Sequence, residues 1–351
     1  MAGLYLTGSI NVSTVDDAFR LVGTRLQPGV TRVPDGEPGE RANWVLTQAP
    51  LFLDNPTLER VGDRVRVRSG VEVAFRPVDY HTVAAESYQR FLAARRDGVL
   101  APESRFLVSI PTPINAVNSF AEFDSWVEIA YAYEQRLRES VLRLQELVPP
   151  RDLAVQWDLP TELATVEGWF DNPYGGFETI FAAPARLAAW IDDEAELTFH
   201  LCYGDSKFGA SPFMGTPPDE EAARRGGRHI LPRDATAIVT LANGLSRHVP
   251  RRIDAIHAAT VATWTRRAQR QPLSGLALEP GTEVYLGLLH AEDGAEGARA
   301  RAALAAEFLP EFGIATECGL GRHSPEQLEA VLTAWSEFAS AERELVSEVR
   351  G

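Results

Sequence analysis

The chain has 351 residues, of which 45% are hydrophobic and 24% charged, the ordinary composition of a globular protein with a sizeable core. Its 49 acidic and 34 basic residues give a formal net charge of -15, which argues against a nucleic-acid partner because phosphates need a basic surface. The start of the chain lacks the features of a secretory signal, and no run approaches the ~20 apolar residues of a membrane span. We therefore expect a cytoplasmic protein with no membrane partner.

Short β-rich runs alternate with longer amphipathic segments along the chain, as in a parallel sheet whose strands are joined by helices. The runs that read as strands are Leu4–Ile10, Gly29–Val33, Arg105–Ile110, Leu153–Asp158, Glu196–Cys202, Arg252–Ala258, Val284–His290 and Gly313–Cys318. Because eight such strands favour closure over an open sheet, we predict an α/β fold, a single (β/α)8 TIM barrel over residues 1–351.

Segments with apolar residues at helical spacing lie between these strands. They are Asp124–Leu147, Pro184–Ile191, Asp234–Leu245, Gly297–Phe308 and Pro325–Val349. The last helix has Ser324 as its predicted cap, Pro325 at its first position and Gln327 three residues after the cap, which is a helix-start signature.

Two segments interrupt the alternation. We predict an insertion of about residues 51–100 after the second strand, made of a hairpin and a helix. The runs Arg64–Arg68 and Val71–Phe75 flank Ser69-Gly70 and predict the β-hairpin. The polar loop from Gly204 to Arg228 is rich in glycine and proline and is a candidate lid over the site.

The fifth and eighth predicted strands end in residue types that bind metals. The carboxyl ends of all barrel strands meet at one face, where TIM-barrel enzymes carry their active sites. His200 and Cys202 are two apart and share a face of the fifth strand, and Cys318 ends the eighth. One imidazole and two thiolates favour zinc. His257, which ends the sixth strand, is a candidate fourth ligand.

Other readings of these residues exist. Single cysteines and histidines are more often buried structural residues than ligands. A nucleophilic Cys–His pair is a second alternative, but it leaves one cysteine without a role. Because the only two cysteines of the chain both end predicted strands, we favour the metal site.

Further polar residues end other predicted strands. Ser9 follows Gly8 on the first strand and suits a ligand carboxylate, whereas Glu37 and Asp158, after the second and fourth strands, suit an ammonium group. His290 ends the seventh strand and is a candidate proton donor to a leaving group. The alternatives are an exposed acidic turn around Glu37 and a structural histidine at position 290.

These residues, in this order, resemble the C-terminal catalytic barrel of cobalamin-independent methionine synthase and its relatives, a superfamily that includes uroporphyrinogen decarboxylase and coenzyme M methyltransferases. The motifs that carry the resemblance span nearly the whole chain. They are Gly8-Ser9, Gly36-Glu37-Pro38, Val155-Gln156-Trp157-Asp158, His200-Leu201-Cys202-Tyr203, His290 and Glu317-Cys318-Gly319-Leu320. The His-x-Cys pair followed by a distant Cys-Gly is the specific part.

The resemblance implies zinc on His200, Cys202 and Cys318, with His257 where the family often has a glutamate ligand. It also implies an amino-acid pocket formed by Ser9, Glu37 and Asp158. The family's aspartate is usually followed by glutamate, whereas Asp158 is followed by Leu159, so the acceptor thiol stays open. No counterpart of the folate-binding N-terminal half is seen, and we expect a corrinoid or a carrier protein as methyl donor.

The hypothesis from the sequence is an enzyme that transfers a methyl or small alkyl group to a zinc-bound small-molecule thiol, with His290 as the acid. Two alternatives remain at this point. One is a metal-independent decarboxylase or lyase that acts on a carboxylated small molecule. The other is a non-catalytic barrel that binds a thiol or a metal.

Overall fold

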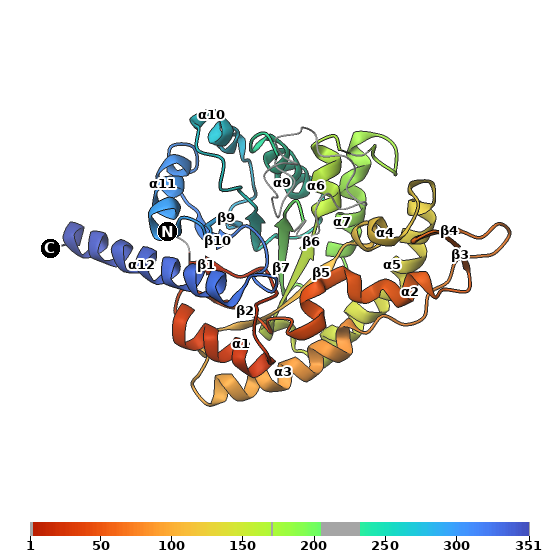
Figure 1. Ribbon diagram of the computed structural model, residues 1–351, viewed down its shortest axis with the longest axis horizontal. Helices are drawn as coiled ribbons and strands as arrows, with labels where there is room; N and C mark the ends of the chain where they lie inside the picture. The colour runs from red at the N-terminus through yellow and green to blue at the C-terminus, as the bar shows by residue number, and fades with distance from the viewer. Residues whose placement is uncertain (1–2, 170, 205–231, 351) are drawn as a thin grey trace.

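Eight parallel strands form the centre of the molecule in a computed structural model that describes residues 3–169, 171–204 and 232–350 (Figure 1). The strands are β1 (Leu4–Tyr5), β2 (Arg32–Pro34), β5 (Arg105–Pro111), β6 (Leu153–Asp158), β7 (Glu196–Leu201), β8 (Ala255–Ala258), β9 (Glu283–Leu289) and β10 (Gly313–Thr316). Their order in the sheet is β1-β10-β9-β8-β7-β6-β5-β2. The predicted barrel class is confirmed.

The barrel closes through single backbone bonds rather than a full ladder between β1 and β2. Leu4 N donates to Gly29 O at 2.7 Å, and Ile10 N donates to Gly36 O at 2.8 Å. These bonds hold the residues that follow β1 beside those that follow β2. The first predicted strand, Leu4–Ile10, was therefore too long, because the sheet pairing of β1 ends at Tyr5.

Inside the barrel the strands contribute alternating side chains, and the remaining faces pack on helices. The interior layer contains Tyr5, Leu107, Ala154, Ala255, Tyr285 and Ala315. The Tyr5 hydroxyl group lies 2.7 Å from Gln156 Oε1 and 2.9 Å from Thr198 Oγ1, so a polar layer sits directly in the barrel. All six residues of β6 are buried, as expected for a parallel strand covered on both faces.

The helices lie around the strands, and the last one extends away from the barrel body (Figure 1). They are α1 (Val15–Leu21), α2 (Ala49–Leu53), α3 (Tyr80–Arg96), α4 (Pro113–Phe120), α5 (Trp126–Leu147), α6 (Pro160–Val166), α7 (Ala182–Ala188), α9 (Thr236–His248), α10 (Arg267–Arg270), α11 (Gly294–Ala306) and α12 (Pro325–Arg350). The predicted start of α12 is confirmed, since Ser324 Oγ accepts from Gln327 N at 3.2 Å and Gln327 Oε1 accepts from Ser324 N at 3.0 Å. Among the described helices, none has the length and apolar character needed to cross a membrane.

The hairpin after β2 exists, but one of its predicted strands was wrong. The paired strands are β3 (Leu58–Val61) and β4 (Arg64–Val67), and Val71–Phe75 form neither helix nor strand. A two-residue turn explains the difference, because Gly62 takes φ 64 at its first position, a conformation that hairpin turns require and glycine adopts readily. The helix α3 follows the hairpin and lies inside the insertion, where a helix was predicted without bounds. The candidate lid after Gly204 lies outside the described residues.

Candidate metal centre

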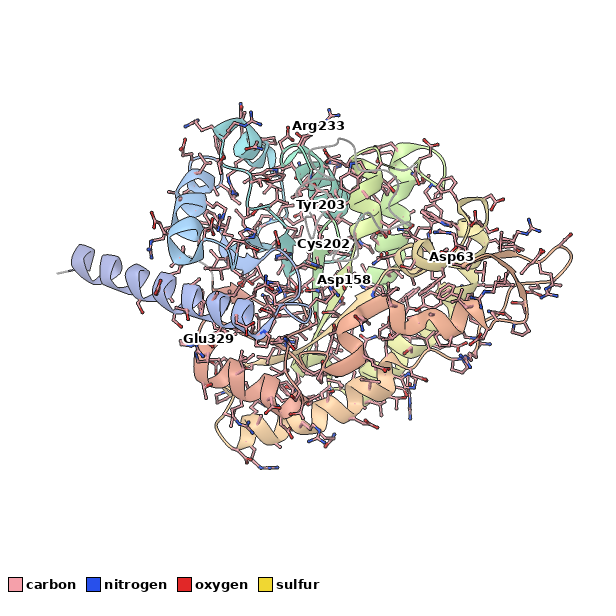
Figure 2. All side chains as sticks on the ribbon, viewed as in Figure 1. Asp63, Asp158, Cys202, Tyr203, Arg233 and Glu329 are labelled. Atoms are coloured by element: carbon pink, nitrogen blue, oxygen red, sulfur yellow. The ribbon has the colours of Figure 1, made fainter. Side chains whose placement is uncertain are left out.

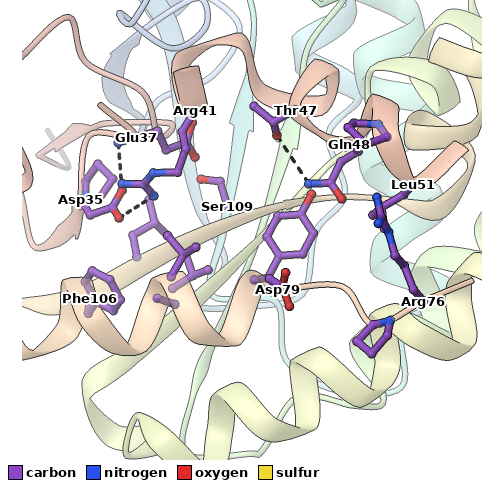
Figure 3. A pocket seen from close by; sticks show the side chains of 18 residues that line it. Asp35, Glu37, Arg41, Thr47, Gln48, Leu51, Arg76, Asp79, Phe106 and Ser109 are labelled. Carbon is purple, nitrogen blue, oxygen red and sulfur yellow. Dashed lines mark hydrogen bonds and ion pairs between the residues drawn. The ribbon is translucent and has the colours of Figure 1, made fainter. Parts of the chain in front are cut away.

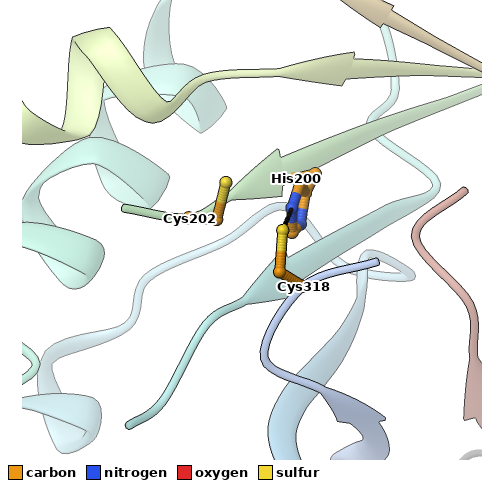
Figure 4. A group of neighbouring side chains, drawn as sticks. All are labelled: His200, Cys202 and Cys318. Carbon is orange, nitrogen blue, oxygen red and sulfur yellow. Dashed lines mark hydrogen bonds between the residues drawn. The ribbon is translucent and has the colours of Figure 1, made fainter. Parts of the chain in front are cut away.

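His200, Cys202 and Cys318 meet at the carboxyl end of the barrel. His200 is the penultimate residue of β7, Cys202 follows that strand, and Cys318 lies two residues after β10. Their ligand atoms all lie within 4.8 Å of one another. Figure 4 shows the three side chains grouped together. His200 and Cys202 are buried, and Cys318 is partly exposed. The three residues that the sequence singled out therefore form one cluster that can hold a metal ion.

The chemistry and spacing of this donor set fit zinc. His200 Nε2 lies 3.6 Å from Cys318 Sγ. Two tetrahedral ligands at the usual Zn–N and Zn–S distances are about 3.6 Å apart, so these two atoms already have the separation that one ion needs. The hydrogen bond with Cys202 lowers the pKa of the Cys318 thiol well below its usual value, which favours the thiolate that binds metals.

His257 contacts His200 instead of joining the group. Its Nε2 lies 2.8 Å from Thr316 O, and because a carbonyl only accepts, this nitrogen carries the proton. Burial and the neighbouring His200 lower the pKa of His257 to about 3, so the ring is neutral and its Nδ1 is an acceptor. His200 Nδ1, at 2.7 Å, must then donate, which leaves His200 Nε2 unprotonated on the side of Cys318.

The prediction of His257 as a fourth ligand is not supported by this geometry, because both of its ring nitrogens are engaged elsewhere. Its place between His200 and Thr316 is that of a positioning residue. It fixes the tautomer of His200 that presents Nε2 to a metal.

Replacing this positioning residue should weaken the metal site without removing it. In His257→Phe, His200 Nδ1 loses its acceptor, and we expect zinc affinity to fall about 10- to 100-fold, the usual effect of losing such a partner. His257→Gln is the matched control, since its amide can accept from His200 and donate to Thr316, and it should retain most of the affinity. Competition with a chromophoric chelator measures both variants. Equal affinity of His257→Phe and the unmodified protein would contradict the assignment, and an equally large loss in both variants would identify His257 as a ligand.

Ser9, Glu37 and Asp158 lie around the same small pocket as the three metal-binding candidates. The pocket has a volume of about 50 Å³, room for a few water-sized groups. Its lining comprises Thr7, Ser9, Glu37, Asp158, Pro160, His200, Cys202, Gly204, Cys318, Gly319 and Arg322. Asp158 and Cys202 lie at the centre of the molecule in Figure 2. The structure therefore brings the predicted substrate-binding residues and the predicted ligands together.

Glu37 is held in an unusual state on one wall of this pocket. Its backbone has φ 43, in the left-handed region that a side chain rarely adopts, and its amide N donates to Asp35 Oδ1 at 2.9 Å. Burial raises the pKa of the Glu37 carboxyl well above its usual value, and the charges of Asp35 and Asp158 raise it further. A ligand ammonium group beside Glu37 and Asp158 would reverse that effect, because an opposite charge stabilises the ionised carboxylate.

Ser9 links the end of β1 to the loop that carries Cys318. Leu320 N donates to Ser9 O at 2.6 Å, and Gly321 N donates to Ser9 Oγ at 3.3 Å. A Cβ atom on Gly319 would lie 2.4 Å from Ser9 Oγ, so only glycine allows this approach directly after Cys318. The contact explains why a glycine follows the second cysteine.

Arg322 is a pocket residue that the sequence reasoning missed. It lies four residues after Cys318, its Nη1 donates to Ala42 O at 2.8 Å, and its charge lowers the pKa of both Glu37 and Cys318. Arginine is suited to binding carboxylates. The available signal was a basic residue in the loop that follows the eighth strand, on the catalytic face of the barrel.

His290 is buried directly after β9, close to the metal-binding loop. Its Nδ1 lies 3.2 Å from Glu317 Oε2, the residue before Cys318. Its Nε2 is buried and has no hydrogen-bond partner in the part of the chain that the structure describes. Because Glu317 fixes one side of the ring, the other nitrogen is available to a proton acceptor or donor. This residue does not line the small pocket itself.

Glu162 on α6 is a second residue that the sequence reasoning missed. Its side chain is almost fully buried, four residues after Asp158 in the chain, and burial raises the pKa of its carboxyl to about 7. A carboxyl group with this pKa is largely protonated below neutral pH, and the repulsion from Asp158 raises the pKa in the same direction.

The raised pKa of Glu162 should make stability depend on pH. Because the folded protein binds this proton more tightly than the unfolded chain, the stability it provides is complete below pH ~4.5 and is lost as the pH rises to ~7. Glu162→Gln has no carboxyl group to ionise and does not lose this stability. Its free energy of unfolding, relative to that of the unmodified protein, should therefore rise by up to ~3 kcal/mol between pH ~4.5 and ~7. Urea unfolding between pH 4.5 and 8 measures the difference, with the exposed Glu86→Gln on α3 as control. A difference that stays constant with pH would contradict the prediction.

The chain shares its fold with methionine synthases of the B12-independent type. A B12-independent methionine synthase from Shewanella sp. W3-18-1, in complex with selenomethionine, superposes with a TM-score of 0.63 at 16% identity and covers 99% of both chains. A putative vitamin-B12-independent methionine synthase from Listeria monocytogenes gives a TM-score of 0.50 at 14% identity, over 97% of this chain and 98% of the other. A methyltransferase from Methanosarcina mazei gives a TM-score of 0.47 at 12% identity, over 97% of this chain and 95% of the other. By sequence, the chain matches no protein-family model, and no curated protein matches it significantly.

Proposed function

We propose that this protein is a zinc-dependent enzyme that transfers a methyl or small alkyl group to the thiol of a small amino-acid-like substrate. The observation that carries the proposal is the grouping of His200, Cys202 and Cys318 in one small pocket with Glu37 and Asp158. The shared fold with a methionine synthase crystallised with selenomethionine agrees with a sulfur-containing amino acid as product.

The three ligand candidates would hold the metal, and the chain prepares them for it. The bond from His200 Nδ1 to His257 leaves Nε2 unprotonated beside Cys318, and the hydrogen bond with Cys202 lowers the pKa of the Cys318 thiol. Zinc held here would lower the pKa of a substrate thiol at its open coordination position, so that the sulfur reacts as a thiolate.

Other polar residues of the same pocket would orient the substrate. Glu37 and Asp158 lie at a buried site of negative charge, which suits an ammonium group, and Arg322 suits a carboxylate. Because both groups line the pocket that contains the ligand candidates, an α-amino acid with a short thiol side chain matches their arrangement. Burial excludes water and strengthens each of these contacts.

In the transfer step, the sulfur electron pair forms the new S–C bond while the bond between the alkyl carbon and its donor breaks. The departing donor group keeps the electron pair of the broken bond, and it needs a proton if it leaves as an anion. His290 is the proposed source of this proton, since Glu317 contacts its Nδ1 and its Nε2 has no partner among the described residues. We propose a corrinoid or a carrier protein as methyl donor.

The proposal is tested by turnover of defined thiols. Zinc-loaded protein is incubated with methylcobalamin and either homocysteine, cysteine or 2-mercaptoethanol, and thioether products are measured by mass spectrometry. We expect methylation of an amino-acid thiol in preference to 2-mercaptoethanol, which lacks the groups that Glu37, Asp158 and Arg322 would bind. Stoichiometric zinc binding without zinc-dependent sulfur alkylation of any of these thiols would refute a catalytic role and leave a metal- or thiol-binding protein.

A further inference from the structure

A second and much larger cavity lies between the barrel and the segment that follows β2. Its volume is about 740 Å³, within the range of small-molecule binding sites. Its lining includes Pro34, Asp35, Glu37, Arg41, Gln48, Arg76, Tyr80, Ala84, Phe106 and Ser109 (Figure 3). No step of the proposed reaction uses this space.

The inserted segment forms the outer wall of the cavity. The 3₁₀-helix Gly39–Gln48 and α2 cover one side, and the start of α3 covers another, while β5 supplies the inner wall. Side chains such as Leu51, Val83 and Phe106 make most of the surface apolar. An apolar space of this size, bounded by a folded insertion, is suited to the apolar body of a ligand.

Glu37 connects this cavity with the metal-side pocket, because it lines both. Beside it, Ser109 Oγ donates to Thr7 O at 3.0 Å, and Thr7 lines the metal-side pocket. A Cβ atom on Gly8 would lie 3.0 Å from Ser109 Oγ and 3.1 Å from Glu37 Oε1, so the absence of a side chain there leaves these groups room. A ligand at the inner end of the cavity would therefore touch a residue of the proposed substrate site.

The polar groups of the cavity indicate the chemistry of its ligand. At one end Arg41 is neutralised by Asp35, with Nη1 to Oδ2 at 2.8 Å, whereas Arg76 at the other end is exposed and has no ion-pair partner among the described residues (Figure 3). Asp79 lines the cavity as well, but forms no ion pair with Arg76. Gln48 Oε1 is buried without a hydrogen-bond partner in the described part of the chain. Apart from the Asp79 carboxylate, the unpaired groups are thus one cation at the mouth and one acceptor inside.

From these observations we infer that the cavity is a second small-molecule site for a mostly apolar compound with one anionic group. The apolar body lies against β5 and α3, a hydrogen-bond donor of the ligand reaches Gln48, and the anion pairs with Arg76. The site is separate from the metal centre and shares Glu37 with its pocket.

The test uses 1-anilinonaphthalene-8-sulfonate, which has an apolar aromatic body, an N–H group and a sulfonate. We expect saturable fluorescence enhancement with one site per chain. Ala84→Phe should weaken binding at least about tenfold, because Ala84 is buried and lines the cavity. Ala85→Phe is the matched control on α3, since Ala85 does not line the cavity, and its affinity should stay within about twofold. Circular dichroism and thermal melting check that both variants fold.

The anionic contact is tested separately with Arg76→Gln, an exposed substitution that should not affect folding. This substitution should lower the affinity for the sulfonate probe about three- to tenfold and leave the affinity for uncharged N-phenyl-1-naphthylamine unchanged. Absence of saturable binding, or equal losses in Ala84→Phe and Ala85→Phe, would overturn the site, and equal effects of Arg76→Gln on both probes would overturn its anion preference. Cys202→Ser should bind the probe normally, so failure of the metal function is distinguishable from failure of this site.

Discussion

Cys202→Ser or Cys318→Ser should each remove stoichiometric zinc from the purified protein. Apparent binding energies of four-ligand zinc sites are about 10–16 kcal/mol, so one ligand accounts for about 3–4 kcal/mol, or a 10²- to 10³-fold loss of affinity. A serine hydroxyl is not deprotonated at neutral pH and is a poor replacement for the thiolate that the surroundings of Cys318 favour. Alkyl transfer should fall with the metal content.

The measurement is zinc per chain after dialysis against a weak chelator. Ala259→Ser serves as a matched control, because it also introduces a buried hydroxyl directly after a barrel strand, β8, at the same end of the barrel. It should retain one zinc per chain. Full retention of zinc in both cysteine variants would exclude these residues as ligands and with them the proposed chemistry.

His290→Gln should lower kcat about 10²- to 10⁴-fold while zinc content and KM change little. This is the usual contribution of a positioned acid, and glutamine keeps the size and a hydrogen bond to Glu317 but cannot transfer a proton. The effect should be largest for a donor whose leaving group is a strong base and should shrink for an activated donor that leaves without a proton.

The control for this variant is His248→Gln on α9, whose ring contacts Gly244 O and the exposed Glu178, far along the chain from the metal ligands. Its kcat should stay within about twofold of the unmodified enzyme. If His290→Gln keeps full activity with a basic leaving group, the protein uses another acid or needs none, and the histidine is structural.

The barrel was predictable from the sequence because its strands are short, buried runs that alternate with helical segments. β6 matches its prediction over Leu153–Asp158, since the strand is apolar and buried apart from Gln156, which bonds inside the barrel, and Asp158, which ends it. The bounds of α3 within the insertion were not predicted, because its buried stripe is Ala84, Ser87, Tyr88 and Phe91, in which alanine and serine give little hydrophobic signal despite their helical spacing.

The candidate metal-binding group was also predictable, because His200, Cys202 and Cys318 are the right residue types at strand ends. The role of His257 was not predictable from the sequence. Whether it can bind a metal or orient His200 depends on which way its ring points within one barrel layer. The raised pKa of Glu162 and the cavity behind Glu37 depend on how helices pack on the barrel, and no local sequence pattern encodes that packing.

The bond from His257 to Thr316 O bears on how this protein folds. His200 and Cys318 are 118 positions apart, and the strand that ends at Thr316 supplies both the carbonyl that orients the imidazoles and the loop with the second thiol. A nascent chain that has not yet added β10 therefore has neither a completed donor set nor an oriented His200. Metal capture would come after ring closure, and by mass action the ion would then oppose reopening of the barrel at the seam where β10 joins β1 and β9.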